Sequence, residues 1–349
     1  MKITYHFKET YKFITKRFAI MVIKYLFGIQ EPEKPFDGKV DSIIILGQER
    51  FGDLIVLTPL IKKLRQIYPD SSITLLGVTE MISFLYDDPN LNRVVNIKRT
   101  KSLIRREILR DHYDIFFNTK DHPSFTFLFL TARIRARYKI GIYHQAHIGY
   151  FNYMHYFEDA IPTAEKNMAP LYFMNIPFKK DDLRPYLPDK APSDEIRKFA
   201  AVLKGINPLG INLSASNPGK EWPLAYWEKL LAEINLPFVI LAMPDDAEKK
   251  ERLERTHKNV HPSPPTRTLL DAGYLISHLR LLITTDTALV HVASCSNTPA
   301  IVLYRLERDM KKFPPFSDHS RIHISPTTNL ADILPNEVIE STREFLKNT

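Results

Sequence analysis

The sequence predicts two α/β domains in series, each built around a parallel β-sheet. The chain has 349 residues, more than one hydrophobic core usually accommodates. Short apolar runs, such as residues 43–46 and 281–284, alternate with stretches of helical length, and the order strand, helix, strand is typical of a parallel sheet. A proline-rich stretch without apolar periodicity, residues 176–192, separates the two halves and is typical of an interdomain linker.

The same pattern places the domains and their elements. We expect a basic N-terminal arm over 1–36, a first domain over 37–175, the linker over 176–192, and a second domain over 193–349 that ends in a helix. In the first domain, strands are expected at 43–46, 73–76, 94–97, 114–118 and 138–142, with helices at 53–68, near 80, at 100–111 and at 125–135, followed by irregular aromatic sequence to residue 156. In the second, strands are expected at 209–213, 238–241, 281–284 and 300–303, with helices near 223–235, 246–256, 268–278 and 286–295.

Composition excludes several classes of protein. Apolar residues make up 44% and charged residues 25% of the chain, which is ordinary for a globular protein and excludes a disordered one. The single cysteine, Cys295, excludes intramolecular disulfides and thiolate metal clusters, and no stretch has the layout of a cleavable signal peptide. We therefore expect a cytoplasmic protein.

The basic residues are concentrated at the N-terminus. Residues 1–27 interleave aromatic and aliphatic side chains with one acid, Glu9, and with six bases: Lys2, Lys8, Lys12, Lys16, Arg17 and Lys24. This pattern is typical of an amphipathic helix on an anionic membrane, and it is too charged for a spanning helix. Two alternatives stay open, packing on its own domain and dimerisation. Nucleic acid is not an expected partner, because no recognisable reader motif accompanies the bases.

Three segments at expected strand ends carry unusual polar residues, and ligands of open parallel sheets bind at the carboxyl ends of the strands. The first segment, 47–53, joins a buried strand to a helix and ends in Asp53. Asp53 either caps that helix or projects into a cleft as a general base. The segment is not a dinucleotide fingerprint, because the glycine spacing is absent and Glu49 would repel a phosphate.

The second segment, 212–223, combines small hydroxyl residues with one lysine. Ser214 and Ser216, with exposed backbone amides and Lys220, would form a cradle for phosphate oxygens. Trp222 is expected to hold the loop in place, and Pro223 to occupy the first position of the next helix. The alternative is that Lys220 is a solvent-exposed loop residue.

The third segment, 281–291, is an apolar strand that runs into a helix. Thr287 at the helix start can bond a phosphate together with the free amides of the first turn. His291 follows one helical turn later and shares a face with Thr287, so that His291 and Asp286 would flank the anion. The alternative is that Asp286 caps the helix and His291 is an interior histidine whose hydrogen bonds are satisfied.

A metal ion is not implied by the sequence. No Asp-x-Asp pair is present and the histidines lack metal-ligand spacing. The charge of a leaving diphosphate would therefore be met by Lys220, Thr287 and helix amides.

Together the three segments resemble glycosyltransferase family 9, the ADP-heptose:lipopolysaccharide heptosyltransferases. The Gly-Asp with a following Thr-Pro of that family is matched by Gly52, Asp53, Thr58 and Pro59, and its Lys-x-Trp-Pro by residues 220–223. Its Asp-Thr-Gly-x-x-His is matched by Asp286, Thr287 and His291, with Ala288 in place of the glycine. The resemblance covers residues 41–305.

The resemblance implies a fold of GT-B type, two Rossmann-like domains facing each other across a cleft. It also implies inverting, metal-independent transfer of a sugar, from ADP-heptose or a related donor, to a lipopolysaccharide core or another lipid-linked or cell-surface glycan at the inner face of the inner membrane. The nucleotide sugar is a substrate, and no cofactor is expected. The implied roles are a general base, Asp53; a group that stabilises the diphosphate, Lys220; and donor-binding residues Ser214, Ser216, Asp246, Asp286, Thr287 and His291. Arg50 and Lys120 are the acceptor-binding candidates, in segments where the chain departs from the family pattern.

Two departures from the family pattern keep other functions open. Ala288 replaces a glycine that lets the backbone approach the ligand, and residues 118–123 lack the glycine-containing acceptor loop. A non-catalytic nucleotide-sugar-binding protein and a sugar-nucleotide epimerase are the alternatives.

Overall fold

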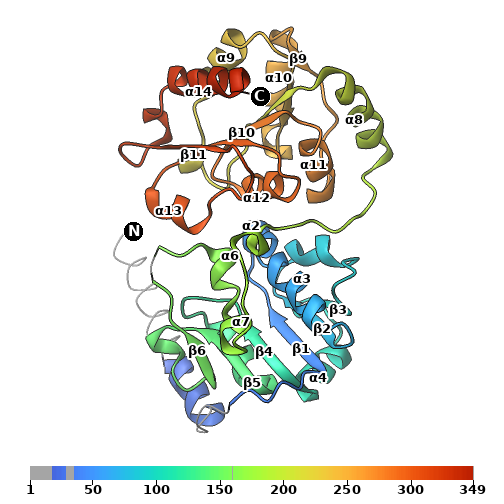
Figure 1. Ribbon diagram of the computed structural model, residues 1–349, viewed down its shortest axis with the longest axis vertical. Helices are drawn as coiled ribbons and strands as arrows, with labels where there is room; N and C mark the ends of the chain where they lie inside the picture. The colour runs from blue at the N-terminus through green and yellow to red at the C-terminus, as the bar shows by residue number, and fades with distance from the viewer. Residues whose placement is uncertain (1–17, 29–34, 159, 349) are drawn as a thin grey trace, which may run out of the picture. The chain divides into compact units, whose positions relative to one another are not determined.

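The computed structural model describes residues 18–28, 35–158 and 160–348 (Figure 1). The chain forms two compact units. Unit 1 comprises Met1–Leu54, Leu60–Asp159 and Glu165–Lys179, and unit 2 comprises Ile55–Pro59, Ala160–Ala164 and Lys180–Thr349. The domain boundaries expected from the sequence stay predictions.

Unit 1 is built on a six-stranded sheet in the order β3-β2-β1-β4-β5-β6, and the strand pairs are all parallel. The strands are β1 Ser42–Leu46, β2 Ser72–Gly77, β3 Arg93–Asn96, β4 His112–Asn118, β5 Arg135–Ile142 and β6 Tyr153–His155. The five expected strands are confirmed, but the region expected to be irregular contains β6, whose Tyr153 pairs with Ile140 of β5. This edge strand has only three half-buried residues, too few to show the alternation by which a strand is recognised.

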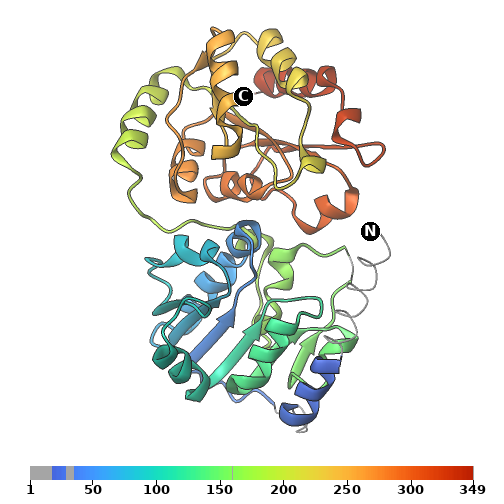
Figure 2. The same cartoon turned by 180° about the vertical axis from the view of Figure 1, so that it is seen from behind.

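Helices cover both faces of this sheet. They are α2 Phe51–Ile55, α3 Thr58–Ile67, α4 Ser102–Arg110, α5 Phe125–Arg133, α6 Thr163–Lys166 and α7 Ala169–Phe173, with short 3₁₀ turns η1 Glu80–Leu85 and η2 Gln145–His147. Ile44 and Phe116 face a core shared with α4, α5 and a helix over residues 18–27. Figure 2 shows these three helices on one face of the sheet, and Figure 1 shows α3 and α7 on the other.

The single helix expected over 53–68 is wrong, because the chain forms two helices, α2 and α3. Pro59 has no N–H to donate to the carbonyl of Ile55, so the α-helical bond between them cannot form. The hydroxyl of Thr58 donates to that carbonyl instead, at 2.8 Å, and accepts a bond from the amide of Tyr186 at 3.0 Å. Asp53 is consequently the third residue of a short helix and not the first residue of a long one.

Unit 2 repeats the architecture with the order β12-β11-β10-β7-β8-β9, again with parallel pairs. Its strands are β7 Leu209–Asn212, β8 Phe238–Leu241, β9 Val260–His261, β10 Leu281–Thr285, β11 Ala300–Tyr304 and β12 Arg321–Ile324. The four expected strands are the four central ones. The two edge strands were not expected from the sequence, since β9 has two residues and β12 alternates polar side chains with half-exposed isoleucines.

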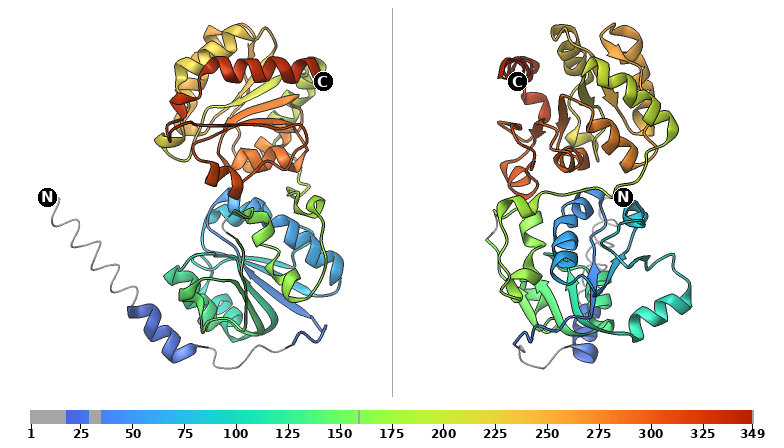
Figure 3. Two further views of the ribbon diagram at one scale, coloured as in Figure 1. Left: turned by 60° about the vertical axis from the view of Figure 1, so that its left-hand side comes forward. Right: turned by 45° about the vertical axis from the view of Figure 1, so that its right-hand side comes forward.

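The helices of unit 2 are α8 Asp194–Ile206, α9 Leu224–Glu233, α10 Ala247–Thr256, α11 Leu269–Ile276, α12 Ala288–Cys295, α13 Glu307–Lys312 and α14 Pro335–Asn348. Short 3₁₀ turns are η3 Lys180–Leu183, η4 Pro218–Lys220, η5 Pro244–Asp246 and η6 Leu330–Asp332. The last helix, α14, lies beside α9 (Figure 3). Its Val338 and Phe345 pack into the core that contains Trp227 of α9. The helix expected at the end of the chain is therefore present, whereas α8 and α13 were not expected.

Most of the expected amphipathic arm lies outside the described residues, which begin at Phe18. Residues 18–27 form a helix that buries Ile23 in the core of unit 1 and leaves Met21 and Tyr25 exposed. One face of this helix therefore packs on its own domain. This agrees with one of the two alternatives to membrane binding that the sequence left open. No helix in the described part of the chain is long and apolar enough to cross a bilayer.

Candidate active site

The carboxyl edge of the unit 1 sheet is organised by the loops that follow β1 and β4. The side-chain amide of Gln48 donates to the carbonyl of Thr119 at 3.1 Å, and the hydroxyl of Thr119 donates to the carbonyl of Leu46 at 2.9 Å. Across these joined loops the ammonium of Lys120 pairs with the carboxylate of Glu49. Lys120 is buried, and its ammonium also lies 4.9 Å from the ring centre of Phe127. The charge of Glu49 is thus matched within the unit.

Asp53 lies at the same edge, in the first turn of α2. Burial raises the pKa of its carboxyl group to about 6, while the positive charges of Lys120 and Arg50 oppose that rise. A carboxylate with a pKa close to the working pH is suited to general-base catalysis. Arg50, predicted to contact the acceptor, precedes α2 and is exposed.

Lys166 also belongs to this edge, although the sequence analysis did not identify it. Its buried ammonium lies 3.2 Å from a carboxylate oxygen of Asp121, whose other oxygen contacts the ring of His122 at 2.9 Å. The contact with His122, followed by Lys166, holds the pKa of Asp121 well below its ordinary value. No local pattern marks Lys166, because α6 reaches this edge from 45 residues along the chain.

In unit 2, the turn between β10 and α12 is fixed by side-chain hydrogen bonds. Thr287 is the N-cap, and its hydroxyl accepts the amide of Leu289 at 3.3 Å. The side-chain amide of Asn212, at the end of β7, donates to the hydroxyl groups of Thr284 and Thr287 at 3.0 and 3.2 Å. The expected start of the helix at residue 286 is therefore wrong, since α12 begins at Ala288. The cap is Thr287 and not Asp286, which frees the Asp286 carboxylate for another partner.

That partner is Lys220, whose ammonium forms an ion pair with the Asp286 carboxylate. Lys220 is therefore not a solvent-exposed loop residue. Burial raises the pKa of Asp286 and the nearby Lys220 opposes this. The loop that carries Lys220 is anchored to the core, because Trp222 is buried and its indole donates to the carbonyl of Ile333 at 2.9 Å. Pro223 is the N-cap of α9, one position before the expected one.

Ser214 and Asp246 are also brought together. The hydroxyl of Ser214 donates to one carboxylate oxygen of Asp246 at 2.6 Å and accepts the amide of Met243 at 2.7 Å. The other oxygen of Asp246 lies 2.7 Å from the ammonium of Lys249. Ser216 does not join this pair: it is exposed, and its hydroxyl accepts a bond from Asn217 at 3.3 Å.

His291 lies inside unit 2, as the alternative interpretation required, but it is not the satisfied histidine of that interpretation. Its side chain is buried, and burial lowers its pKa to about 4, so the ring is neutral at pH 7. Nδ1 of this ring has no hydrogen-bond partner among the described residues. The ring centre lies 5.8 Å from that of Phe313, and the backbone carbonyl accepts the thiol of Cys295 at 3.1 Å.

Arg305 is a cation of this edge that the sequence analysis missed. It follows β11, and its Nε donates to the carbonyl of Thr328 at 2.9 Å. A side chain at position 219 would place its Cβ 3.0 Å from Nη1 of Arg305, so Gly219 leaves room for the guanidinium next to Lys220. No described acidic side chain forms an ion pair with Arg305. The available signal was an arginine immediately after an expected strand.

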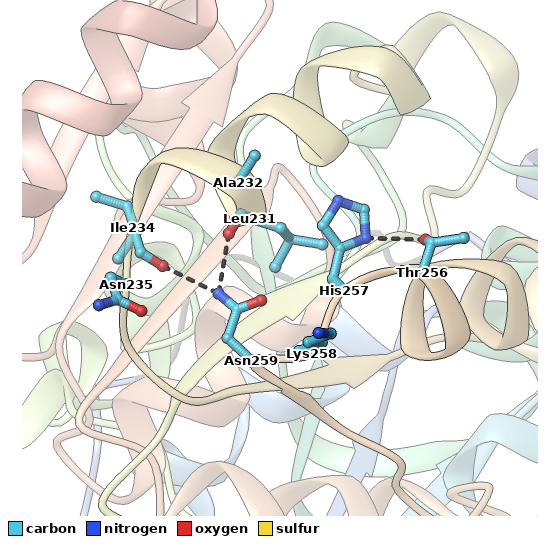
Figure 4. Close-up of a pocket in the computed structure, with 8 residues that line it drawn as sticks. All are labelled: Leu231, Ala232, Ile234, Asn235, Thr256, His257, Lys258 and Asn259. Atoms are coloured by element: carbon cyan, nitrogen blue, oxygen red, sulfur yellow. Dashed lines mark hydrogen bonds between the residues drawn. The ribbon is translucent and has the colours of Figure 1, made fainter.

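A surface hollow lies at the opposite, amino-terminal edge of this sheet, around the end of α9 (Figure 4). Asn259, just before β9, donates to the carbonyls of Leu231 and Ile234 at 2.9 and 3.0 Å. These bonds satisfy the free carbonyl groups at the end of α9. The hollow is therefore explained by helix termination and does not contain the predicted site residues.

Replacing Lys220 should destabilise unit 2, because it leaves the buried carboxylate of Asp286 without its partner. We expect K220M to lose about 1–3 kcal/mol of unfolding free energy at pH 7.5, and K220M/D286N to recover most of it. The matched control is K249M, whose half-exposed ion pair contributes less than about 1 kcal/mol. Urea unfolding measures all three differences. Equal midpoints for K220M and the unmodified chain would refute a stabilising role for the pair.

Comparison with known proteins relates this geometry to one family. The family model for glycosyltransferase family 9 (heptosyltransferase) matches residues 102–338. Lipopolysaccharide heptosyltransferase 3 of Escherichia coli is 24% identical over 276 residues, which cover 72% of this chain and 80% of that relative. The described residues contain no group of three or more His, Cys, Asp or Glu side chains that could hold a metal ion.

Solved structures share the fold. A glycosyltransferase family 9 protein from Veillonella parvula DSM 2008 has a TM-score of 0.74 at 17% identity, with coverage of 90% of this chain and 100% of that one. The ADP-heptose lipopolysaccharide heptosyltransferase II of E. coli has a TM-score of 0.68 at 20% identity, with coverage of 88% and 99%. The predicted GT-B class is confirmed by two parallel six-stranded sheets of this kind. Because the family model covers more than half of the chain, the protein is a glycosyltransferase and belongs to glycosyltransferase family 9.

Proposed function

We propose that this glycosyltransferase moves a heptose from an ADP-linked donor to a lipopolysaccharide core or a related lipid-linked glycan, with inversion and without a metal ion. The observation that carries the proposal is the division of chemistry between the two sheet edges. Unit 1 supplies a carboxylate whose pKa lies near neutrality, and unit 2 supplies cations and a helix N-terminus. The names of the relatives support the substrates, since one is a lipopolysaccharide heptosyltransferase and heptosyltransferase II is named for ADP-heptose and lipopolysaccharide.

In the proposed reaction Asp53 is the general base. Its carboxylate takes the proton of the acceptor hydroxyl, whose oxygen forms a bond with the anomeric carbon of the sugar. The bond from that carbon to the phosphate oxygen breaks, and ADP leaves with the electron pair. A single displacement of this kind inverts the anomeric configuration. Arg50 and Lys120, at the same edge as Asp53, are the proposed acceptor contacts.

The leaving diphosphate would be stabilised by Lys220, Arg305 and the first-turn amides of α12. Lys220 has three N–H donors and can keep its contact with Asp286 while donating to a phosphate oxygen. Thr287 and Ser216 would add hydroxyl groups, and the Ser214 and Asp246 pair would hold the nucleoside. His291 is buried and neutral, so we assign it to the support of α12. Its Nδ1 has no hydrogen-bond partner among the described residues, and the sugar nucleotide would have to enter unit 2 to reach it.

The proposed acceptor places the enzyme at the cytoplasmic face of the inner membrane. Residues 1–27 remain the proposed contact with that membrane, on the strength of their sequence. Family membership favours transfer over the epimerase and over a non-catalytic binding protein, and the transfer assay below distinguishes them.

Replacing Asp53 by asparagine should abolish transfer and yet stabilise the fold at neutral pH. Loss of the base is expected to lower kcat/KM by about 10²–10⁴-fold. Because folding raises the pKa of Asp53, the protonated carboxyl contributes stability that is complete below about pH 4 and lost as the pH rises through about 6. We therefore expect D53N to match the unmodified chain near pH 4 and to exceed its unfolding free energy by about 2–3 kcal/mol at pH 7.5.

Heptose transfer and urea unfolding across this pH range test the expectation. The control is D70N at an exposed turn, which should change neither quantity. Transfer by D53N at the unmodified rate would show that another group is the base, whatever the stability result.

The donor nucleotide can be identified by thermal shift with ADP, UDP, GDP and CMP. ADP at a hundred times its dissociation constant should add about 2.7 kcal/mol of stability. R305Q should bind ADP about tenfold more weakly, since a charge-assisted contact is lost, whereas R308Q, exposed on α13, should not differ. Stabilisation by UDP and not by ADP would contradict the heptose donor.

Metal independence and stereochemistry are tested in one assay. Transfer from ADP-heptose to a core oligosaccharide should continue at an unchanged rate in excess EDTA. Nuclear magnetic resonance of the product should show the anomeric configuration opposite to that of the donor. A rate restored only by added divalent cation, or a retained configuration, would contradict the mechanism.

A further inference from the structure

Exposed aromatic side chains are distributed unequally between the two units. In the described part of the chain nine large aromatic side chains are exposed, and all nine belong to unit 1. The exposed large apolar residues of unit 2 are aliphatic: Val202, Met243, Ile322, Ile324 and Leu334. Aromatic side chains are enriched at membrane interfaces, where one part of the ring contacts hydrocarbon and the other part contacts water.

Most of these aromatic residues of unit 1 lie on two neighbouring helices, helix 18–27 and α5. Tyr25 is 86% exposed and Met21 59%, while Phe125 and Phe129 of α5 are each 38% exposed. We define the aromatic surface as Met21, Tyr25, Leu26, Phe27, Phe125 and Phe129. The helices lie on the same face of the unit 1 sheet (Figure 2).

The aromatic surface is continuous across the two helices. The rings of Phe125 and Phe129 stack with their centres 6.3 Å apart. The guanidinium of Arg133 then bridges the helices, at 6.0 Å from the ring centre of Phe129 and 5.7 Å from that of Phe27. Helix 18–27 is fixed in this position, because Tyr150 donates its hydroxyl to the carbonyl of Ile20 and Ile23 is buried.

The charges around the aromatic surface are cationic. Arg133 lies within it, Lys24 belongs to helix 18–27, and α4 on the same face of the sheet exposes Arg105, Arg106 and Arg110. One acid, Glu107, accompanies the three arginines of α4. Apolar rings among arginine and lysine side chains fit a layer of anionic phosphate headgroups above hydrocarbon.

A second copy of the chain would be a poorer occupant. In a two-fold dimer the same surface faces itself. Arg133 and Lys24 would then be present on both sides of the interface, and a cationic surface brought against a second copy of itself costs free energy.

We propose that the aromatic surface seats unit 1 on an anionic lipid bilayer, with α5 as a second contact beside the N-terminal arm. This inference rests on the proposed function in one respect, since a lipid-linked acceptor would lie in that bilayer. The geometry of unit 1 fits such an acceptor, because α5 begins at Phe125, directly after the loop that carries Lys120 and Asp121 at the edge of Asp53.

Vesicle flotation tests the docking surface. The full-length protein should float with phosphatidylethanolamine vesicles that contain phosphatidylglycerol, and much less with neutral vesicles. F125S/F129S should lower the partition coefficient by about tenfold, because two rings no longer enter the interface. R133Q should lower the partition coefficient by less than F125S/F129S does. It should also make binding less dependent on the phosphatidylglycerol content of the vesicles. The matched controls are Y86S in unit 1 and V202S in unit 2, which should float like the unmodified protein.

The outcomes separate this inference from the proposed function. An unchanged thermal shift with ADP shows that each variant is folded, and F125S/F129S should transfer heptose to a delipidated core oligosaccharide at the unmodified rate. If F125S/F129S floats as well as the unmodified chain, α5 is not part of the docking surface. If sedimentation shows a dimer that only this variant loses, the surface joins two copies and the inference is overturned. Flotation without any transfer would instead count against the proposed function.

Discussion

Both units depend on one constraint: in a parallel sheet covered by helices on both faces, charged side chains cost the least free energy where the strands end. Ile43 to Leu46 and Leu281 to Ile283 are fully buried, and the charged groups appear within a few residues of them. These groups therefore stand at the boundary between a low-dielectric interior and solvent. That position raises the pKa of both Asp53 and Asp286, and it explains why the buried lysines at these edges have nearby carboxylates.

The two edges meet this constraint in different ways. In unit 1 the cations Lys120 and Lys166 are each paired with a carboxylate, and no ammonium group of the described residues forms an ion pair with Asp53. Burial raises the pKa of Asp53, so its basicity is obtained at a cost in stability that a purely structural residue would not carry. In unit 2 the Lys220 and Asp286 pair is nearly neutral as a whole. Arg305 and the start of α12 are positive groups of this edge that no described carboxylate pairs with.

The central strands and the motif positions could be predicted from the sequence, because β-branched runs such as Ile43–Leu46 carry their own signal. The break between α2 and α3 could also have been found, since Pro59 cannot complete the helix. The edge strand β6 could not, because three residues have no periodicity. Lys166 reaches its position through tertiary packing, and no local spacing indicates it. Arg305 could have been identified, since it immediately follows an expected strand. His291 and Thr287 share a helical face, which predicted that both would reach the ligand. The ring of His291 instead packs near Phe313 inside unit 2, a contact that the local sequence does not indicate.

The environment of Cys295 has a practical consequence for studying this protein. It is the sole cysteine of the chain, its thiol donates to the carbonyl of His291, and burial raises its pKa far above that of a free thiol. At neutral pH almost none of it is the reactive thiolate. The natural sequence is therefore already suited to site-specific spectroscopy: a single cysteine introduced on either unit could carry a fluorophore or a spin label without prior removal of the native one.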